Sequence, residues 1–492
     1  MRRLLAALLA IALVVPRPVR AAREGGGEAD LGRRFLLEVR SELPIVDDPA
    51  VAGYVDRIGH KLVATLGPQQ FDYHFYVVQH PALNAFAVPG GYVFVFSGLL
   101  AHLSNDDELA GVLGHEIGHV SAHHIVRQQQ QGQAWTAAAL LGVLLSAVNP
   151  VLGAGALAAA ETAQLKYSRE FEQEADYLGL RYSTQAGYDP HSLGSFFKTL
   201  LAEARINPAG VPPYMLSHPI TEDRIAHVET TITAQKLKTP SGRPAASAEL
   251  AETEAVARAI ADPAEVVIGR YRRLADEKPD DAERQFLLGR VYQTVGQLDA
   301  ARAALEKCRD LGGLGGRVDR PLGAVYAALK EPAKARESLT RHLTKHPDDG
   351  WAHLELGKAI ADAGSSGDAV VEFQRALALD PDLDEAHRLM GLELGRKGDE
   401  AEGFYHLALA SRLRGELEQA LSQFQRTDHL LTPGSVRQVE VERAIEELEP
   451  LVRERERARQ ERRRTGRRGI ADERPLSAPA AMQRGPARPS TR

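Results

Sequence analysis

The chain has 492 residues, more than one ordinary domain core accommodates, so two or three domains are expected. Its net charge of -6, with 26% charged residues, gives no broad basic surface and argues against nucleic-acid binding. Cys308 is the single cysteine, which excludes both an internal disulfide and a cysteine-based metal site. Any metal site must therefore use histidines and carboxylates.

The N-terminus has the pattern of a secretory signal peptide. Arg2 and Arg3 precede an apolar run at residues 4–15, and small residues follow near Ala21. We expect residues 1–21 to be removed and the mature chain to be exported to the periplasm. The alternative is an uncleaved anchor, for which the apolar run is short.

Residues 30–235 are predicted to form an α+β domain. Helical periodicity covers residues 30–65 with a turn at 43–49, and strand-like segments follow at residues 71–78 and 92–96. Ser104 and Asp107 have the spacing of a capping box, which predicts a helix that begins there and runs to about Val126.

Two further segments differ in composition from their surroundings, one inside this domain and one between it and the C-terminal half. Residues 134–160 are almost entirely apolar, but Asn149-Pro150 divides them into pieces that are short for membrane spans. They fit buried helices or a lid over a cleft, and a hairpin in peripheral contact with a membrane or a substrate is the alternative. Residues 236–263 are rich in Pro, Ser, Ala and Glu, which favours a linker with at most a loose helix.

An internal repeat occupies residues 264–432. The motif Leu-Gly-x-x-Tyr begins at Leu288 and at Leu322, and a weaker version begins at Leu356, so the spacing is 34 residues each time. This is the period of tetratricopeptide repeats (TPR), whose paired helices stack into an all-α solenoid with a concave binding face. We expect about four repeats, followed at residues 433–492 by a charged helix and a disordered tail.

The predicted helix after Ser104 contains the motif His115-Glu116-Ile117-Gly118-His119. The two histidines lie one turn apart on one face and can bind a single Zn²⁺. Glu116 is offset around the helix, which suits a general base that takes a proton from a water acidified by the zinc.

A third ligand is needed, and the best candidate lies downstream. His123 and His124 lack the spacing of a third ligand and are interpreted as structural residues or as residues that support the ligands. Glu172 and Asp176 share one face of a predicted helix, so Glu172 can bind zinc while Asp176 orients a ligand histidine; Glu174 points away. The alternative for this segment is a solvated acidic helix.

These motifs together resemble the gluzincin family that includes HtpX and the CAAX-prenyl endopeptidases. With the signal peptide and the repeats, the chain is similar to the BepA-type periplasmic zinc metalloproteases of that family. Further matching pieces are Val46-Asp-Asp-Pro49, Asn84-Ala-Phe-Ala-Val-Pro-Gly-Gly91, Ser217-His-Pro219 and Arg224-Ile225. The chain departs from the family pattern in its long charged extension and in the loss of Leu-Gly-x-x-Tyr at Met390 to Leu394.

The resemblance implies that His115, His119 and Glu172 are the zinc ligands and that Glu116 is the catalytic carboxylate. It also implies that His218 lies near the metal, where it either stabilises the oxyanion or occupies the fourth coordination position in a latent form. By the same analogy the strand at residues 92–96 binds an extended substrate along its edge. Packing of its aromatic residues in the core is an equally good interpretation.

The sequence therefore predicts a zinc-dependent endopeptidase with one Zn²⁺ per chain. The resemblance points to misfolded or stalled outer-membrane proteins as substrates, with the repeats binding clients or the outer-membrane assembly machinery. Two alternatives are a chaperone or adaptor with a latent metal site and a membrane-bound processing protease.

Overall fold

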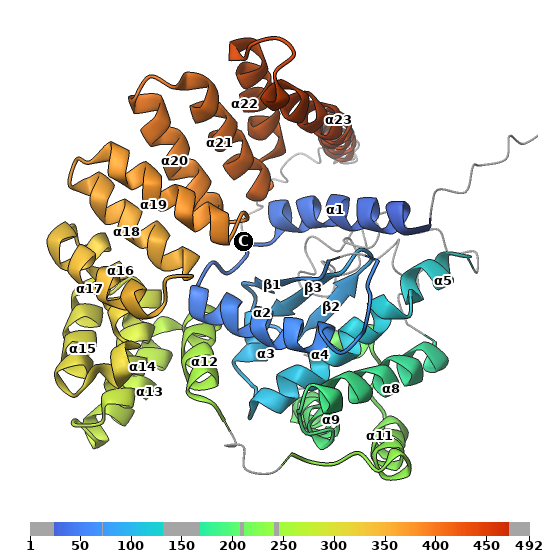
Figure 1. The fold of residues 1–492 in the computed structure, drawn as a ribbon. Helices are drawn as coiled ribbons and strands as arrows, with labels where there is room; N and C mark the ends of the chain where they lie inside the picture. The colour runs from blue at the N-terminus through green and yellow to red at the C-terminus, as the bar shows by residue number, and fades with distance from the viewer. Residues whose placement is uncertain (1–23, 71, 131–167, 207–210, 241–245, 472–492) are drawn as a thin grey trace, which may run out of the picture.

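The computed structural model describes residues 24–70, 72–130, 168–206, 211–240 and 246–471 (Figure 1). The predicted signal peptide at 1–21, the apolar stretch at 134–160 and the last 21 residues of the predicted tail, 472–492, lie outside this part. Within the described residues, no helix combines the length and apolar character that crossing a membrane requires.

The N-terminal domain is built around a three-stranded sheet with the order β1-β3-β2. β1 is His74–Val78, β2 is Ala85–Val88 and β3 is Tyr92–Phe96. The central strand β3 is parallel to β1 and antiparallel to β2. The strand-like segments of the sequence correspond to β1 and β3. β2 was not predicted, because it has only four residues and no alternation of apolar and polar residues.

Both faces of β3 are covered, so all five of its residues are buried. Val93 and Val95 face the core formed with α2 (Pro49–Val63) and α4 (Asp106–Ser121). The three aromatic residues of the strand face the opposite side, where α1 (Glu24–Glu42) covers them through residues such as Phe35. The short helix α3 (Ser97–Leu100) continues directly from β3.

The helix predicted from Ser104 to about Val126 is divided in the structure. α4 begins at Asp106 behind the N-cap Asn105 and ends at Ser121, and α5 (His124–Gln130) begins after a break. His123 occupies the break with a φ of 54°, and its ring contacts Glu28 of α1 at 2.9 Å. The prediction of one continuous helix was wrong because this tertiary contact leaves no trace in the local apolar periodicity.

Among the described residues, the N-terminal half has five more helices: α8 (Arg169–Gln185), α9 (His191–Ile206), α10 (Pro213–Ser217), α11 (Glu222–Gln235) and α12 (Ala248–Ala261). α12 lies inside the stretch that composition predicts to be a linker with at most a loose helix. Instead Ser247 caps a 14-residue helix, and Leu250 and Val256 are buried in the N-terminal core. Burial against α2 and α3 stabilises a helix that composition alone does not predict.

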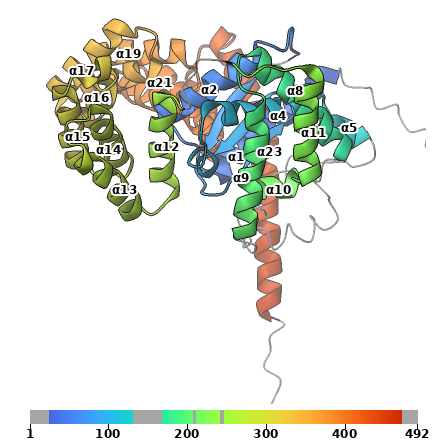
Figure 2. The same ribbon diagram turned by 90° about the horizontal axis from the view of Figure 1, so that it is seen from below.

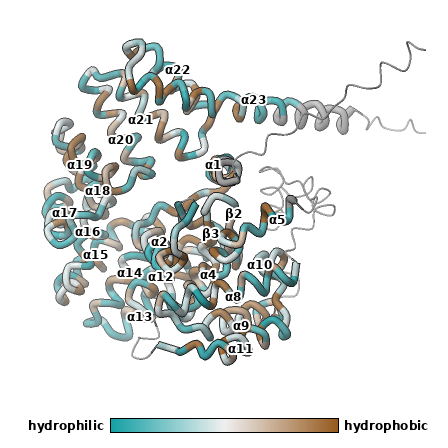
Figure 3. The backbone as a smooth tube through the Cα atoms, turned by 45° about the vertical axis from the view of Figure 1, so that its right-hand side comes forward, coloured by the Kyte–Doolittle hydropathy of each residue, from teal (hydrophilic) through white to brown (hydrophobic). Residues whose placement is uncertain are grey.

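The C-terminal half is the predicted all-α solenoid. Its helices are α13 (Ala264–Glu277), α14 (Ala282–Thr294), α15 (Leu298–Asp310), α16 (Asp319–Ala328), α17 (Pro332–Lys345), α18 (Gly350–Asp362), α19 (Ser366–Leu379), α20 (Asp384–Arg396), α21 (Glu400–Leu413), α22 (Leu417–Leu430) and α23 (Val436–Ala471). The pairs from α14–α15 to α20–α21 are four successive repeats. α23 includes the charged helix predicted after Pro433 and projects from the repeats with mostly hydrophilic residues (Figure 3).

The glycine of the repeat motif has a packing role. A Cβ at Gly323 would lie 2.6 Å from Cγ of Leu339 on the partner helix, and a Cβ at Gly289 would meet Leu305 at the same distance. The last pair lacks the Leu-Gly-x-x-Tyr motif but keeps Gly391, where a Cβ would lie 2.7 Å from a backbone oxygen of α21. The helix pairing therefore persists where the sequence motif is lost.

The solenoid curves around the N-terminal domain and contacts it near both ends (Figures 1 and 2). At one end Arg290 of α14 pairs with the α2 N-cap Asp48 at 2.7 Å and with Glu252 of α12 at 2.8 Å. At the other end Leu37 of α1 packs with the apolar residues of α21 to α23, and Arg40 donates a hydrogen bond to the Leu413 carbonyl at 2.8 Å. The N-terminal helix α1 is therefore held between the sheet and the last repeats.

The last repeat contains two buried histidines in contact. Nδ1 of His387 on α20 lies 2.8 Å from Nδ1 of His406 on α21, and the rings stack at 5.1 Å. Burial, the His387 ring and the nearby Arg437 lower the pKa of His406 to about 3. His406 is therefore neutral in the folded protein at neutral and mildly acidic pH.

This pair predicts an acid-sensitive repeat domain. Between about pH 6.5 and pH 3 the unfolded chain takes up a proton at position 406 that the folded chain does not, so stability falls as the pH falls. From pH 7 to pH 5 the loss attributable to His406 is about 2 kcal/mol. Urea unfolding of His406→Gln should show a correspondingly smaller loss, and the exposed His429→Gln should behave like wild type. Equal losses in wild type and His406→Gln would contradict this assignment.

Candidate metal centre

The two histidines and the glutamate of the HExxH motif lie in the C-terminal half of α4 and are buried. The N-cap Asn105 accepts a hydrogen bond from the backbone N–H of Glu108 at 2.9 Å, which fixes the start of this helix. His115 and His119 lie one turn apart, and their Nε2 atoms approach each other to 3.0 Å. The motif therefore presents two imidazole nitrogens to one point, as the sequence predicts.

Close packing of two helices brings the third side chain to this point. Gly114 and Gly118 of α4 face Gly179 and Ala175 of α8, and a Cβ on either α4 glycine would lie 2.9 Å from a backbone oxygen of α8. Because neither helix has a large side chain at the crossing, their backbones touch. Glu172, one turn before Ala175, therefore reaches the two histidines.

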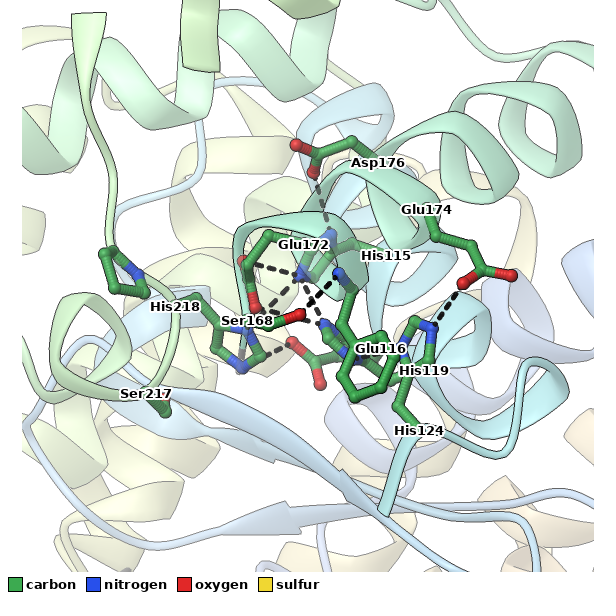
Figure 4. A network of polar contacts seen from close by, with 12 residues as sticks. His115, Glu116, His119, His124, Ser168, Glu172, Glu174, Asp176, Ser217 and His218 are labelled. Carbon is green, nitrogen blue, oxygen red and sulfur yellow. Dashed lines mark hydrogen bonds and ion pairs between the residues drawn. The ribbon is translucent and has the colours of Figure 1, made fainter. Parts of the chain in front are cut away.

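Four buried donors converge at this place (Figure 4). Glu172 lies 3.7 Å from Nε2 of His115 and 3.5 Å from Nε2 of His119. Nδ1 of His218, at the end of α10, lies 3.3 Å from Nε2 of His115 and 3.0 Å from Glu172. A tetrahedral zinc site with bonds of about 2.0–2.1 Å separates its ligand atoms by about 3.3–3.4 Å. The four donors fit one zinc ion without a change of fold.

Glu116 lies beside this cluster. Its Oε1 is buried, has no hydrogen-bond partner among the described residues and lies 3.6 Å from Nε2 of His218. Burial raises the pKa of Glu116, and the neighbouring histidines only partly offset this effect. An unsatisfied carboxylate with a raised pKa next to a metal-ligand cluster is suited to proton transfer.

The Asp176 carboxylate supports His115 as expected from the sequence. Its Oδ1 lies 2.9 Å from Nδ1 of His115. This contact leaves the proton of His115 on Nδ1 and its Nε2 lone pair directed at the cluster. Asp176 is fully buried, so a positive charge must balance it.

Arg224 supplies that charge, and sequence reasoning gave it no role. This buried side chain on α11 donates two hydrogen bonds of 2.7 Å to Asp176 and lies 2.5 Å from Glu172. Burial alone would raise the pKa of both carboxylates, but Arg224, together with the histidines beside each of them, lowers the pKa of Asp176 and holds that of Glu172 well below its ordinary value. In the sequence, Arg224-Ile225 was noted only as one of the motifs that resemble the family. That resemblance does not reveal which carboxylates Arg224 contacts.

Burial and neighbouring charges shift the pKa values of His119 and His218 in opposite directions. Burial holds the pKa of His119 well below its ordinary value, which keeps the imidazole neutral and able to bind a metal. Burial also opposes protonation of His218, but the carboxylates of Glu172 and Glu116 outweigh it and raise the pKa of His218. The raised pKa favours a protonated His218 that donates hydrogen bonds, and a metal would have to displace the proton on Nδ1 to bind there.

The histidines after the motif have separate partners. His123 contacts Glu28, while Nδ1 of His124 lies 2.9 Å from Nδ1 of His119. Glu174, which the sequence places away from the metal, lies 3.2 Å from Nε2 of His124. Of the two histidines, His124 is the one that supports a predicted ligand directly.

The strand β3 does not have the free edge that the resemblance implied for substrate binding. It is the central strand, and its aromatic residues pack in the core. Within the described residues, β2 is the strand with only one partner, while the outer side of β1 forms a bridge between Val78 and Ile45. A pocket lined by Ala87 and Val88 of β2 and by His119 lies next to that edge.

The fold and the cluster define a metallopeptidase-like domain joined to a helical repeat domain. Residues 49–232 match peptidase family M48, so the chain contains an M48 peptidase domain. That range includes all of the cluster and ends within α11.

Curated relatives match the chain over stretches longer than this domain. A Vibrio cholerae protein is 32% identical over 286 residues, which are 56% of this chain and 58% of that protein. The beta-barrel assembly-enhancing protease of Escherichia coli strain K12 is 31% identical over 209 residues, 41% of this chain and 43% of that protein. A mitochondrial metalloendopeptidase of Schizosaccharomyces pombe is 32% identical over 195 residues, 38% of this chain and 54% of that protein. The chain thus matches about half the length of these relatives.

Two solved structures are similar to parts of the chain. MamA is 22% identical with a TM-score of 0.28 and covers 32% of this chain and 91% of its own. YrrB, described as a TPR protein with an unusual peptide-binding site, is 21% identical with a TM-score of 0.30 and covers 36% of this chain and 92% of its own.

The buried charge network predicts a large effect of Arg224→Met on stability. The substitution leaves Asp176 and Glu172 without their shared cation, so the free energy of unfolding should fall by about 3–5 kcal/mol. Arg205→Met is a matched control, because Arg205 pairs with Glu222 at 2.8 Å on the exposed surface; its loss should stay below about 1 kcal/mol. Chemical denaturation measures both values. A small, equal loss in the two variants would show that Arg224 does not hold the network.

Proposed function

We propose that the chain is a zinc-dependent endopeptidase. The observation that carries this proposal is the convergence of four buried side chains that can hold a metal ion beside Glu116, whose buried Oε1 has no hydrogen-bond partner among the described residues. Two imidazoles and a carboxylate are the usual protein ligands of a hydrolytic zinc. The M48 match of the same residues supports this chemistry.

Each residue has a distinct role in the proposed site. His115, His119 and Glu172 hold one Zn²⁺, and Asp176 keeps His115 in the tautomer that binds through Nε2. When bound, zinc supplies a Lewis acid that acidifies water and polarises a peptide carbonyl. Glu116 takes the proton of the attacking water and passes it to the leaving amine.

His218 closes the proposed site in its present arrangement. Its Nδ1 is as close to His115 and Glu172 as ligands of one zinc ion are to each other. This position supports the latent form, in which His218 occupies the fourth coordination position. Displaced from it, His218 would be placed to stabilise the oxyanion of the reaction.

The proposed substrates are unfolded, misfolded or stalled proteins of the bacterial envelope. The Escherichia coli relative is named a beta-barrel assembly-enhancing protease, which supports a role in the assembly of β-barrel proteins. The solenoid would bind clients or the assembly machinery. The signal peptide expected at 1–21 would place the protein in the periplasm. There, residues 134–160 would contact the membrane surface.

A second candidate function is that of a chaperone or adaptor for envelope protein assembly. The position of His218 favours it, because a site held closed would not cleave. Both functions require that the repeats bind unfolded proteins, and they differ only in whether Glu116 is needed.

The first test compares Glu116→Gln and Glu172→Ala with wild type. Glu116→Gln should keep zinc and lose about 100- to 10,000-fold in cleavage of an unfolded protein. Glu172→Ala should lose zinc, because one of the buried ligands is removed. Metal content and the rate of cleavage are the measurements. A wild type that binds zinc and an unfolded client but cleaves nothing would favour the adaptor.

The second test is His218→Ala. If His218 closes the site, its removal should raise the rate of cleavage several-fold while zinc stays bound by His115, His119 and Glu172. His227→Ala, at an exposed position of α11, is the control and should change nothing. A fall of about 100-fold or more would instead assign His218 to the oxyanion.

A further inference from the structure

The outer nitrogen of His119 begins a chain of polar contacts that leads to the surface (Figure 4). Its Nδ1 lies 2.9 Å from Nδ1 of His124, and Nε2 of His124 lies 3.2 Å from Oε2 of Glu174. The same oxygen of Glu174 accepts a hydrogen bond of 2.8 Å from Arg127. Three helices, α4, α5 and α8, thus contribute to the support of one proposed ligand.

The proton positions in this chain follow from the ligand role of His119. A neutral His119 that presents the lone pair of Nε2 to a metal carries its proton on Nδ1. It then donates to Nδ1 of His124, so His124 carries its proton on Nε2 and donates to Glu174. Each of these contacts then has one proton, and the series of contacts ends on the carboxylate of Glu174. Carboxylate–histidine–metal arrangements of other metalloproteins have the same order.

The break after α4 allows His124 to contact His119. In a continuous helix a residue five positions after His119 would point about 140° away from it around the helix axis. Instead α4 ends at Ser121, and His123 adopts a left-handed φ of 54°. The contact of His123 with Glu28 of α1 holds this conformation, which a non-glycine residue seldom adopts. His124 therefore turns back toward the ligand that precedes it.

Packing fixes the orientation of the His124 ring. The ring is fully buried and stacks on Phe171 of α8 at 4.5 Å and 15°. The guanidinium of Arg127 lies 4.7 Å from the same phenyl ring. Glu174 and Arg127 are both partly exposed, so this series of contacts is solvated at its outer end, whereas His124 at its inner end is buried.

His119 and His115 differ in how they are supported. His115 contacts the carboxylate of Asp176 directly, and the buried Arg224 neutralises that carboxylate. His119 reaches its carboxylate through a second imidazole, and Arg127 neutralises the carboxylate at the surface. His124 therefore connects the outer nitrogen of His119, Nδ1, to a negative charge.

We propose that His124 and Glu174 are positioning residues that fix the tautomer and orientation of His119 and thereby set the metal affinity of the site. This inference rests on the proposed zinc site. It goes beyond that proposal because it assigns a function to two residues outside the ligand set and to the helix break that places one of them.

The test measures the zinc affinity of the full mature chain by competition with a chromophoric chelator. His124→Phe keeps an aromatic ring to stack on Phe171 but removes the acceptor for His119, and it should weaken zinc binding about 10- to 100-fold. The matched control is His353→Phe, because His353 is a buried histidine of the repeats that contacts Glu372 at 2.6 Å. It should leave zinc affinity unchanged.

Two further variants separate positioning from folding. Glu174→Ala changes a partly exposed side chain and should weaken zinc binding several-fold, whereas Glu174→Gln keeps an acceptor for His124 and should restore most of the affinity. Unchanged affinity in His124→Phe and Glu174→Ala, or an equal loss in His353→Phe, would overturn the inference. If His124→Phe does not fold, Glu174→Ala decides. A wild type that binds no zinc would overturn the proposed function together with this inference.

Discussion

The close approach of α4 and α8 is the constraint on which the proposed site depends. Gly114 and Gly118 allow α4 to lie directly against the α8 backbone, and without that approach Glu172 could not reach the two histidines. Gly118 lies inside the HExxH motif, so one five-residue segment supplies two proposed ligands, the proposed proton-transfer group and part of the helix contact. The same crossing places Asp176 behind His115 and Glu174 behind His124. One backbone contact thus determines the ligand set and the residues that support it.

Burial gives this arrangement its electrostatic character. Glu116, Glu172 and Asp176 are removed from water, where isolated carboxylates are unstable. Arg224 is paired with two of them, whereas burial raises the pKa of Glu116. The separate roles proposed for these similar side chains agree with their surroundings. The lowered pKa values of Glu172 and Asp176 favour ionised carboxylates, and the raised pKa of Glu116 favours proton exchange. The solenoid adds a second constraint, because its last helices, α21 to α23, hold α1 over the sheet.

Local patterns in the sequence predicted much of this structure, and long-range contacts account for what they missed. The HExxH spacing, the Glu172 and Asp176 face and the 34-residue period each follow from helix geometry, so they were visible without a structure. Arg224 was not assignable, because its partners lie 48 and 52 residues away on another helix. The break at His123 depends on Glu28, and α12 depends on burial against α2 and α3. The place of β3 in the centre of its sheet is a property of strand order, which a five-residue pattern does not contain.

The central claim is that four side chains of α4, α8 and α10 form a binding site for one zinc ion. X-ray absorption at the zinc edge of the purified mature chain tests it most directly. The account predicts one zinc per chain, surrounded only by nitrogen and oxygen at about 2.0–2.1 Å with imidazole scattering. Cys308 is buried in the repeat domain and cannot contribute sulfur. Less than stoichiometric zinc, or zinc with a sulfur ligand, would contradict the account.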